Sequence, residues 1–157
     1  MKARAVKGLD PSAPFLDNAR KIAAVRIGEV WKLGERSQDP RRRDDLHDMR
    51  IATKRLRYVL EITEPCFGAA AKDGAKIARK LQDLLGEIHD CDVMSDRVRA
   101  RAEGIPVEDR RYVGLEALAS YLDARRRVLH RQFVHFWTKL ERNGFRDRLE
   151  AGLGVTA

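Results

Sequence analysis

Long stretches of helical periodicity, broken by proline and glycine at only a few positions, constrain the fold of this 157-residue chain most strongly. Within these stretches apolar residues recur every three or four positions, and the strict alternation that indicates a half-buried β-strand is nearly absent. The periodicity predicts four long helices, at about residues 14–36, 40–63, 73–102 and 107–142. A short basic amphipathic segment, 145–149, follows the last of them.

Proline, glycine and capping residues set the expected helix ends. The second helix is expected to begin at Asp39 or Pro40, because proline suits the first turn of a helix, and to stop before Pro65. The fourth is expected to begin near residue 107 or 108 and to end at Asn143 and Gly144. Long amphipathic helices with short connectors predict an all-α fold, an antiparallel bundle of four long helices with a short C-terminal helix.

No linker divides the chain, so residues 1–157 are predicted to form a single domain with an ordered core at about 15–150. The periodicity also predicts which side chains are buried. The large apolar residues expected to face the core are Phe15, Ile22, Val30, Leu33, Met49, Leu56, Val59, Leu60, Ile77, Leu81, Leu84, Leu85, Ile88, Leu115, Leu118, Leu122, Leu129, Phe133, Phe136 and Leu140.

Composition narrows the class of protein. Apolar residues make up 43% of the chain and charged residues 36%, which excludes a membrane protein and a typical disordered chain. No apolar run approaches the roughly 20 residues that span a bilayer, and the N-terminus lacks the apolar region of a secretory signal. The cysteines, Cys66 and Cys91, lack CxxC spacing, so neither a disulfide scaffold nor a cysteine-rich zinc site is expected. We therefore expect a compact cytoplasmic domain without a cofactor or a metal.

The second predicted helix carries a row of cations. The chain has 32 Lys and Arg against 24 Asp and Glu, and at about 100° per residue part of this excess gathers on one arc of that helix. The members of the arc are Arg43, His47, Arg50, Lys54 and Arg57. A solvated helix face would usually interleave Glu with Lys, whereas neighbours in this row repel each other. The mixture of guanidinium forks, an ammonium group and a ring donor favours anion binding.

Other cations fall on faces that should be buried. Arg26 lies in the apolar stripe of the first helix near Glu29, and Arg126 lies in that of the fourth, with Arg125 and Lys139 on its border. A buried, unpaired guanidinium costs on the order of several kcal/mol, so these groups need partners or a wet cavity. One interpretation is internal ion pairing, for example of Arg26 with Glu29. The other is a polar channel in which several helices direct cations at one bound polyanion.

The third predicted helix has balanced charge and adds two candidates. Lys80 is a candidate anion contact, and His89 shares a face with Asp92 and Asp96. His89 has three open interpretations: it donates to a ligand, it binds a metal, or Asp92 holds it in a structural hydrogen bond. The structural hydrogen bond is the commonest fate of such a histidine.

Two segments resemble the motifs of a known family. Residues 46–58 read LHDMRIATKRLRY, which is similar to the histidine-containing opening motif of CHAD domains, the conserved-histidine α-helical domains. Residues 81–93 read LQDLLGEIHDCDV, which resembles the second motif of that family at about the expected separation. The arginine-rich fourth helix and residues 145–149 are similar to the closing segment of the family, so the resemblance covers about residues 15–150.

The resemblance implies a helical bundle that binds inorganic polyphosphate through a basic surface or channel without catalysis of its own. On this chain it makes His47, Arg50, Lys54 and Arg57 the expected ligand contacts, with His89 as a further one. Together with the cations on the other helices, the candidate polyphosphate-binding residues are Arg26, Arg43, His47, Arg50, Lys54, Arg57, Lys80, His89, Arg125, Arg126 and Lys139.

The resemblance also implies partners. Such domains accompany triphosphate-handling enzymes or associate with polyphosphate granules, so either is an expected setting for this chain. Family members usually carry two bundle halves related by pseudo-symmetry, and 157 residues accommodate one. The chain is therefore expected to be a fragment, a minimal version, or a protomer that rebuilds the second half as a homodimer.

Two other functions fit parts of the sequence. A pI near 9.9 permits a nucleic-acid-binding helical domain, although there is no helix-turn-helix spacing and the 6% of aromatic residues offer no base-stacking platform. The pairs His47-Asp48 and His89-Asp90 invite comparison with helical HD-type metal-dependent phosphohydrolases. Adjacent residues on a helix point about 100° apart, so each pair offers at most one ligand to a metal, and the cations around His47 repel it. We therefore expect binding and not catalysis.

Overall fold

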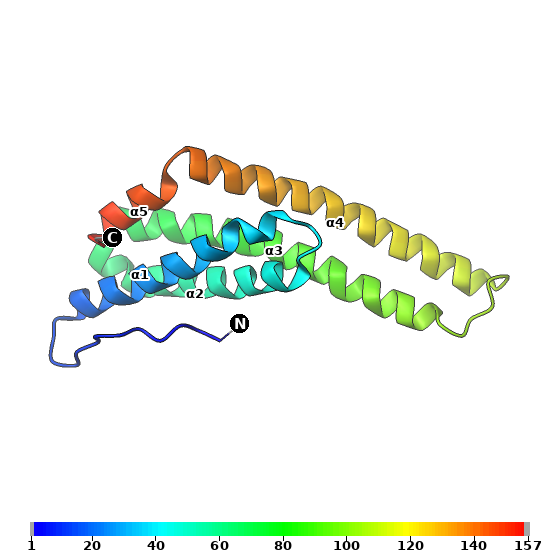
Figure 1. The fold of residues 1–157 in the computed structure, drawn as a ribbon, viewed down its shortest axis with the longest axis horizontal. Coiled ribbons are helices and arrows are strands. Elements are labelled where there is room, and N and C mark those ends of the chain that lie inside the picture. The colour runs from blue at the N-terminus through cyan, green and yellow to red at the C-terminus, as the bar shows by residue number, and fades with distance from the viewer. Residues whose placement is uncertain (1, 156–157) are drawn as a thin grey trace.

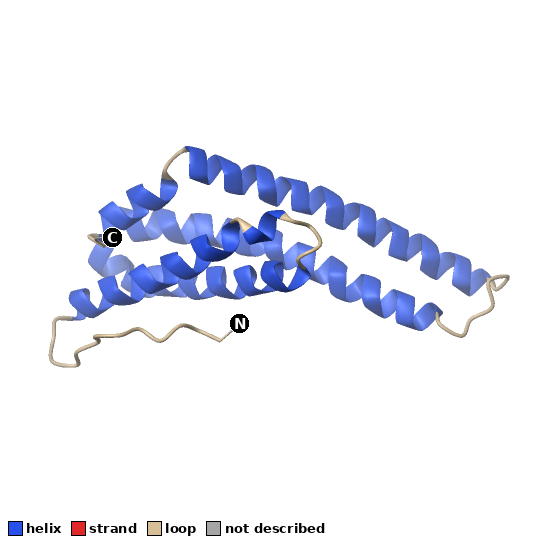
Figure 2. Ribbon diagram, in the orientation of Figure 1, coloured by secondary structure: helices blue, strands red, loops and turns tan. Residues whose placement is uncertain are grey.

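The computed structural model describes residues 2–155, and every regular element within that range is helical (Figure 2). The elements in chain order are α1 (Phe15–Gly34), the 3-10 turn η1 (Arg36–Gln38), α2 (Arg43–Phe67), α3 (Ala69–Ala102), α4 (Arg110–Arg142) and α5 (Phe145–Leu153). This confirms the predicted all-α bundle of four long helices with a short C-terminal helix. No helix in the described range is both long and apolar enough to cross a membrane.

Helix α3 is the backbone of the arrangement (Figure 1). It packs against α2 on one side and against α4 on the other, while α1 packs along α2 and α5 lies at the end where α3 begins. The C-terminal part of α3 and the first part of α4 project beyond α1 and α2 as a two-helix arm. The N-terminal segment runs back along α1 and is held there, because Arg4 donates its backbone N–H to Glu29 at 2.6 Å and Lys21 donates to the Gly8 carbonyl at 2.6 Å.

The predicted end of α2 and the predicted start of α3 are both wrong, because the turn between these helices is shorter than expected. Helix α2 does not stop before Pro65 but includes it and runs to Phe67. Proline has no N–H to donate to the carbonyl four residues earlier, but this break comes only two residues before the helix ends at Phe67. Gly68 then donates to the Glu64 carbonyl at 2.8 Å and takes a φ of +55°, so the chain reverses at one residue. Helix α3 can therefore start at Ala69, four residues before the predicted start.

The start of α4 lies later than predicted. The helix begins at Arg110, not at residue 107 or 108, because Asp109 is its N-cap. The Asp109 carboxylate accepts the backbone N–H of Arg111 at 2.8 Å, which satisfies one of the free donors of the first turn. The Arg111 side chain also donates to this carboxylate and lowers the pKa of Asp109 to about 2.

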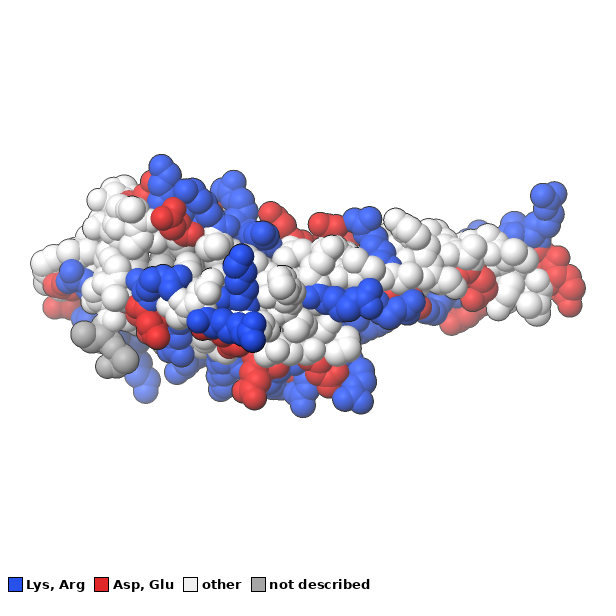
Figure 3. Space-filling model, turned by 90° about the horizontal axis from the view of Figure 1, so that it is seen from above, with Lys and Arg blue, Asp and Glu red and all other residues white. Residues whose placement is uncertain are grey.

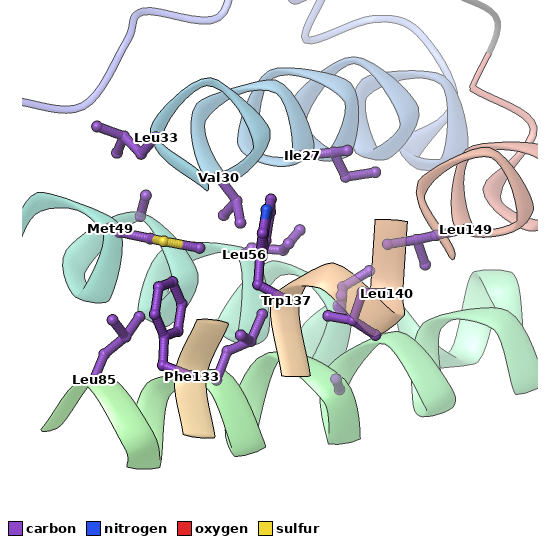
Figure 4. Packing of buried hydrophobic residues seen from close by; sticks show 14 of the residues in the cluster. Ile27, Val30, Leu33, Met49, Leu56, Leu85, Phe133, Trp137, Leu140 and Leu149 are labelled. Carbon is purple, nitrogen blue, oxygen red and sulfur yellow. The ribbon is translucent and has the colours of Figure 1, made fainter. Parts of the chain in front are cut away.

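The core lies where α4 crosses the α1–α2–α3 layer (Figure 4). Phe133 and Trp137 project from α4 toward Met49 and Val30, and all four side chains are buried. The Trp137 indole lies so close to Gly34 of α1 that a Cβ built on this glycine would lie 1.9 Å from Cζ2 of Trp137. A side chain at this position would therefore force the indole ring or the backbone to move.

Two residues expected in the core are exposed. Phe15 is the first residue of α1 and is 59% exposed, because no other element covers the start of that helix closely. Leu118 is exposed because it lies in the arm, where α1 and α2 do not reach α4. Periodicity identifies the apolar face of a helix but does not say how much of that face a neighbour covers.

Candidate functional site

A pair of histidines joins α2 to α3. His47 is in the first turns of α2 and His89 is near the middle of α3, and their ring centroids lie 4.9 Å apart with the rings tilted by 46°. Both side chains are half-buried. Asp92, the expected structural partner of His89, instead forms ion pairs with Arg43 and Arg126. The structure thus places both motif histidines at one point of the α2–α3 seam.

Arg50 lies one turn further along the same seam. Its side chain crosses α3 at Gly86, where an added Cβ would lie 3.7 Å from the Arg50 Nε. This Nε is buried and has no hydrogen-bond partner among the residues that the structure describes. A buried donor without an acceptor costs about 1–3 kcal/mol, so the Arg50 Nε is an unsatisfied donor in the protein alone.

Lys54 and Arg57 continue the row and share Tyr58. The Lys54 Nζ lies 5.7 Å and the Arg57 Cζ 4.6 Å from the centroid of the Tyr58 ring. Arg57 has a carboxylate at ion-pair distance, with 3.5 Å between its Nε and the Glu61 Oε1. Glu61 is also bound by Arg79 at 3.0 Å, so it is divided between two guanidinium groups at the end of the row. We call His47, Arg50, Lys54 and Arg57 the α2 cation row.

Arg43, predicted in the same row, points elsewhere. Its Nε lies 3.0 Å from Asp92 and its Nη1 lies 3.1 Å from Asp96, and the hydrogen bond to Asp96 raises its pKa. Arg126 reaches the same Asp92 at 2.6 Å and also donates to the Pro40 carbonyl at 2.9 Å. Both side chains of the Arg126–Asp92 pair are 11% exposed. The structure satisfies the core-facing Arg126 with an internal ion pair.

Arg26 and Arg125 are also paired. Arg26 lies 2.6 Å from Glu29, with side-chain exposures of 12% and 1%, and it donates to the Arg4 carbonyl at 3.0 Å. For this residue the ion-pair interpretation is the one that the structure shows. Arg125 lies 2.6 Å from Glu87 in a pair that is about half exposed, and hydrogen bonds from Arg125 to Tyr121 and Glu87 raise its pKa.

Lys80 and Lys139 lie in a groove between α3 and α4. The groove has a volume of about 550 Å³. Its lining residues are Lys80, Leu84, Val128, Arg131, Gln132, His135, Phe136 and Lys139. No carboxylate is among these residues, and the Lys80 Nζ lies 4.6 Å from the centroid of the Phe136 ring. We call this the α3–α4 groove.

Sequence reasoning missed Arg131 and His135 in this groove. A signal for them exists, because Arg131, His135 and Lys139 are spaced by four residues and so lie on one face of α4. The prediction for α4 considered only cations in or beside its apolar stripe, and Arg131 and His135 lie on the other side of that helix. The basic face formed by Arg131, His135 and Lys139 was therefore not distinguished from the other arginines of the segment.

The candidate residues do not converge on one channel. Gly86, beneath the Arg50 side chain, and Lys80 lie about 120° apart around α3 at 100° per residue. Three acidic residues fall in the arc between them, namely Asp83, Glu87 and Asp90. Figure 3 shows one face of the molecule, on which Lys and Arg side chains are spread along the length with Asp and Glu side chains between them. The α2 cation row and the α3–α4 groove are thus separate basic surfaces.

Metal ligation was the alternative interpretation of the motif histidines. Within residues 2–155 no three His, Cys, Asp or Glu side chains come together in a group that could hold a metal ion. The residues one helical turn away along the seam, Arg50 after His47 and Gly86 before His89, offer no metal-ligating side chain.

Comparison with known proteins shows the family to which the chain belongs. No curated protein and no solved structure matches this chain. The family model of the CHAD domain matches residues 1–99, which contain α1, α2, most of α3 and both motif histidines. Helices α4 and α5 lie outside the matched range. Because the match spans more than half of the chain and includes the whole α2–α3 seam, the chain belongs to the CHAD domain family.

Proposed function

We propose that this domain binds inorganic polyphosphate through the α2 cation row and His89, and that it acts as a binding module without catalysis of its own. The observation that carries the proposal is a contrast in pairing. Arg26, Arg43, Arg125 and Arg126 each have a carboxylate partner. Arg50 and Lys54 have none within the described part of the chain.

The α2 cation row is also chemically suited to phosphate. The α2 cation row extends about 15 Å along the helix axis, so it offers successive cations to an extended anionic strand. Phosphate oxygens would supply the acceptors that the Arg50 guanidinium lacks, in the charge-assisted form that is the strongest type of hydrogen bond. The association of the CHAD family with polyphosphate- and triphosphate-related proteins supports the same ligand.

The aromatic ring in the row favours phosphate over nucleic acid. Single-strand binders stack bases on free aromatic rings, whereas Lys54 and Arg57 both lie against Tyr58. A ligand without bases needs no stacking platform. A domain that binds in this way would be retained on polyphosphate deposits or beside an enzyme that handles triphosphates.

A charge-matched pair of variants tests the proposal. The site variant carries Arg50→Gln, Lys54→Gln and Arg57→Gln. The control carries Lys32→Gln, Arg101→Gln and Arg110→Gln, which are exposed cations on α1, α3 and α4. Both variants lower the formal charge from +8 to 8 − 3 = +5. Isothermal titration with polyphosphate of defined length should show strong loss of binding in the site variant and little loss in the control.

Salt dependence gives a second measurement on the same proteins. Polyanion binding releases counterions, so the logarithm of affinity should fall linearly with the logarithm of salt concentration, and the site variant should lower this slope by about 2. Equal losses in both triple variants would contradict the proposal and indicate attraction by net charge alone. Preferential binding of duplex DNA would favour the nucleic-acid alternative, and release of phosphate from polyphosphate with added Mg²⁺ would contradict the non-catalytic role.

A further inference from the structure

The α3–α4 groove has a composition unlike that of the α2 cation row. Its volume of about 550 Å³ lies within the range of about 300–1,000 Å³ that is usual for small-ligand sites. Its walls combine cations with an apolar surface formed by Leu84, Val128 and Phe136. Inorganic phosphate chains have no group that would use this apolar surface.

The cations of the groove are free to bind an anion. Among residues 2–155, neither Lys80, Arg131 nor Lys139 has a carboxylate at ion-pair distance, although many other arginines of α3 and α4 do. Arg131, His135 and Lys139 stand on successive turns of α4, about 6 Å apart along the axis, so their side chains can converge on one short phosphate chain. The amide of Gln132 adds a further donor at the same level.

The apolar wall has an exposed part that water covers in the free protein. Val128 is 45% exposed, and it adjoins Leu84 and the half-buried Phe136 in the lining of the groove. Lys80 lies over the Phe136 ring in a contact that is weak at an exposed site, so its ammonium group can leave the ring for a phosphate. A flat aromatic group could then cover Phe136 and Val128 while its anionic end meets the cations.

From this juxtaposition we propose that the α3–α4 groove binds a nucleoside di- or triphosphate. The base lies against Phe136, Val128 and Leu84, and the phosphates meet Arg131, His135 and Lys139. Lys80 turns from the Phe136 ring toward the phosphates. The site is separate from the α2 cation row, because Asp83, Glu87 and Asp90 occupy the arc of α3 between the two surfaces.

Titration of the full chain with ATP, tripolyphosphate and adenosine tests the base and the phosphates separately. Stacking of one base on an aromatic side chain contributes about 1–3 kcal/mol, so ATP should bind at least about fivefold more tightly than tripolyphosphate. Adenosine alone should bind far more weakly than ATP. Arg131→Gln with Lys139→Gln should weaken ATP binding by about tenfold or more, as expected for loss of two charge-assisted contacts.

Two variants probe the apolar wall. Phe136→Leu should remove most of the preference for ATP over tripolyphosphate, and its melting temperature should be measured because Phe136 also packs against the core. Val128→Ser alters an exposed side chain and so should leave the fold intact while reducing the same preference.

The site variant of the α2 cation row separates this inference from the polyphosphate proposal. That variant should bind ATP as the wild type does, while the Arg131 and Lys139 variant should still bind long-chain polyphosphate. The inference would be overturned by undetectable ATP binding at millimolar concentration, by tripolyphosphate binding as tightly as ATP, or by ATP binding that is lost in the α2 variant and kept in the groove variant.

Discussion

The rings of His47 and His89 lie with their centroids 4.9 Å apart across the α2–α3 seam, one from each of the two sequence motifs of the chain. Two protonated imidazoles at this separation repel each other unless an anion lies beside them. A bound polyphosphate would supply that anion and stabilise the protonated rings. If polyphosphate binds beside this pair as proposed, its affinity should depend on pH.

Polyphosphate affinity should rise as the pH falls from about 8 to about 6, the range in which histidine side chains commonly gain their proton. A hydrogen bond to a charged donor is about 1 kcal/mol stronger than one to a neutral donor, which corresponds to about fivefold in affinity. Isothermal titration at both pH values measures the effect. A variant with His47→Asn and His89→Asn is the control for protonation of the ligand itself, and an identical pH profile in this variant would exclude the histidines.

Removal of the Asp92 carboxylate should be among the most destabilising single changes in the chain. Asp92 is buried and pairs with both Arg126 and Arg43. Asp92→Ala leaves the largely buried Arg126 guanidinium without its carboxylate, so the free energy of unfolding should fall by about 3 kcal/mol.

The Arg125–Glu87 pair provides the matched control. Its side chains are 47% and 48% exposed, and Glu87→Ala should lower the free energy of unfolding by less than about 1 kcal/mol. Urea denaturation followed by circular dichroism measures both variants. Similar small losses in the two variants would show that Asp92 has no special structural role.

Gly34→Ala should destabilise the bundle through the contact with Trp137. The added Cβ would lie 1.9 Å from the indole ring, and the backbone or the ring must move to accept it. Overpacking of this kind costs about 1–3 kcal/mol. Gly28→Ala in the same helix is the control, because nothing lies within 4 Å of its added Cβ and alanine favours a helix over glycine by about 0.5–1 kcal/mol. The two melting temperatures should therefore move in opposite directions.

His130 should make the bundle less stable in mild acid. It is buried beside Ser37, whose carbonyl lies 3.1 Å from its Nε2. Burial lowers the pKa of His130 below its ordinary value, and the positive charge of Arg126 adds to this effect. The unfolded chain therefore takes up the proton first, and the free energy of unfolding should fall as the pH drops below about 6.5.

Thermal unfolding at a series of pH values measures this dependence. His130→Gln keeps a side-chain donor for the Ser37 carbonyl but cannot be protonated, so its melting temperature should change less between about pH 7 and pH 5. A variant that follows the wild-type curve would assign the acid sensitivity to other groups.

The helical architecture follows from sequence because periodicity and helix-breaking residues are local properties. The apolar stripe of α2, the stop at Asn143 and Gly144, and the all-α bundle all depend on neighbours within a few positions. The missed boundaries at Pro65 and at Asp109 also depend on local geometry. The positive φ of Gly68 sets the end of α2, and the Asp109 carboxylate caps the start of α4. Apolar periodicity does not report either contact, so it misplaced both helix ends by a few residues.

By itself, the sequence determined which residues carry charge and on which arc of each helix they lie, because a helix places side chains at fixed angles about its axis. It could not determine which cations meet a carboxylate. Arg43 and Arg50 belong to one predicted row, yet Arg43 binds Asp92 and Asp96 of α3 while Arg50 lies over Gly86. Only the packing of α2, α4 and α3 decided this, because ion pairs between helices depend on register and crossing, which are long-range properties of the fold.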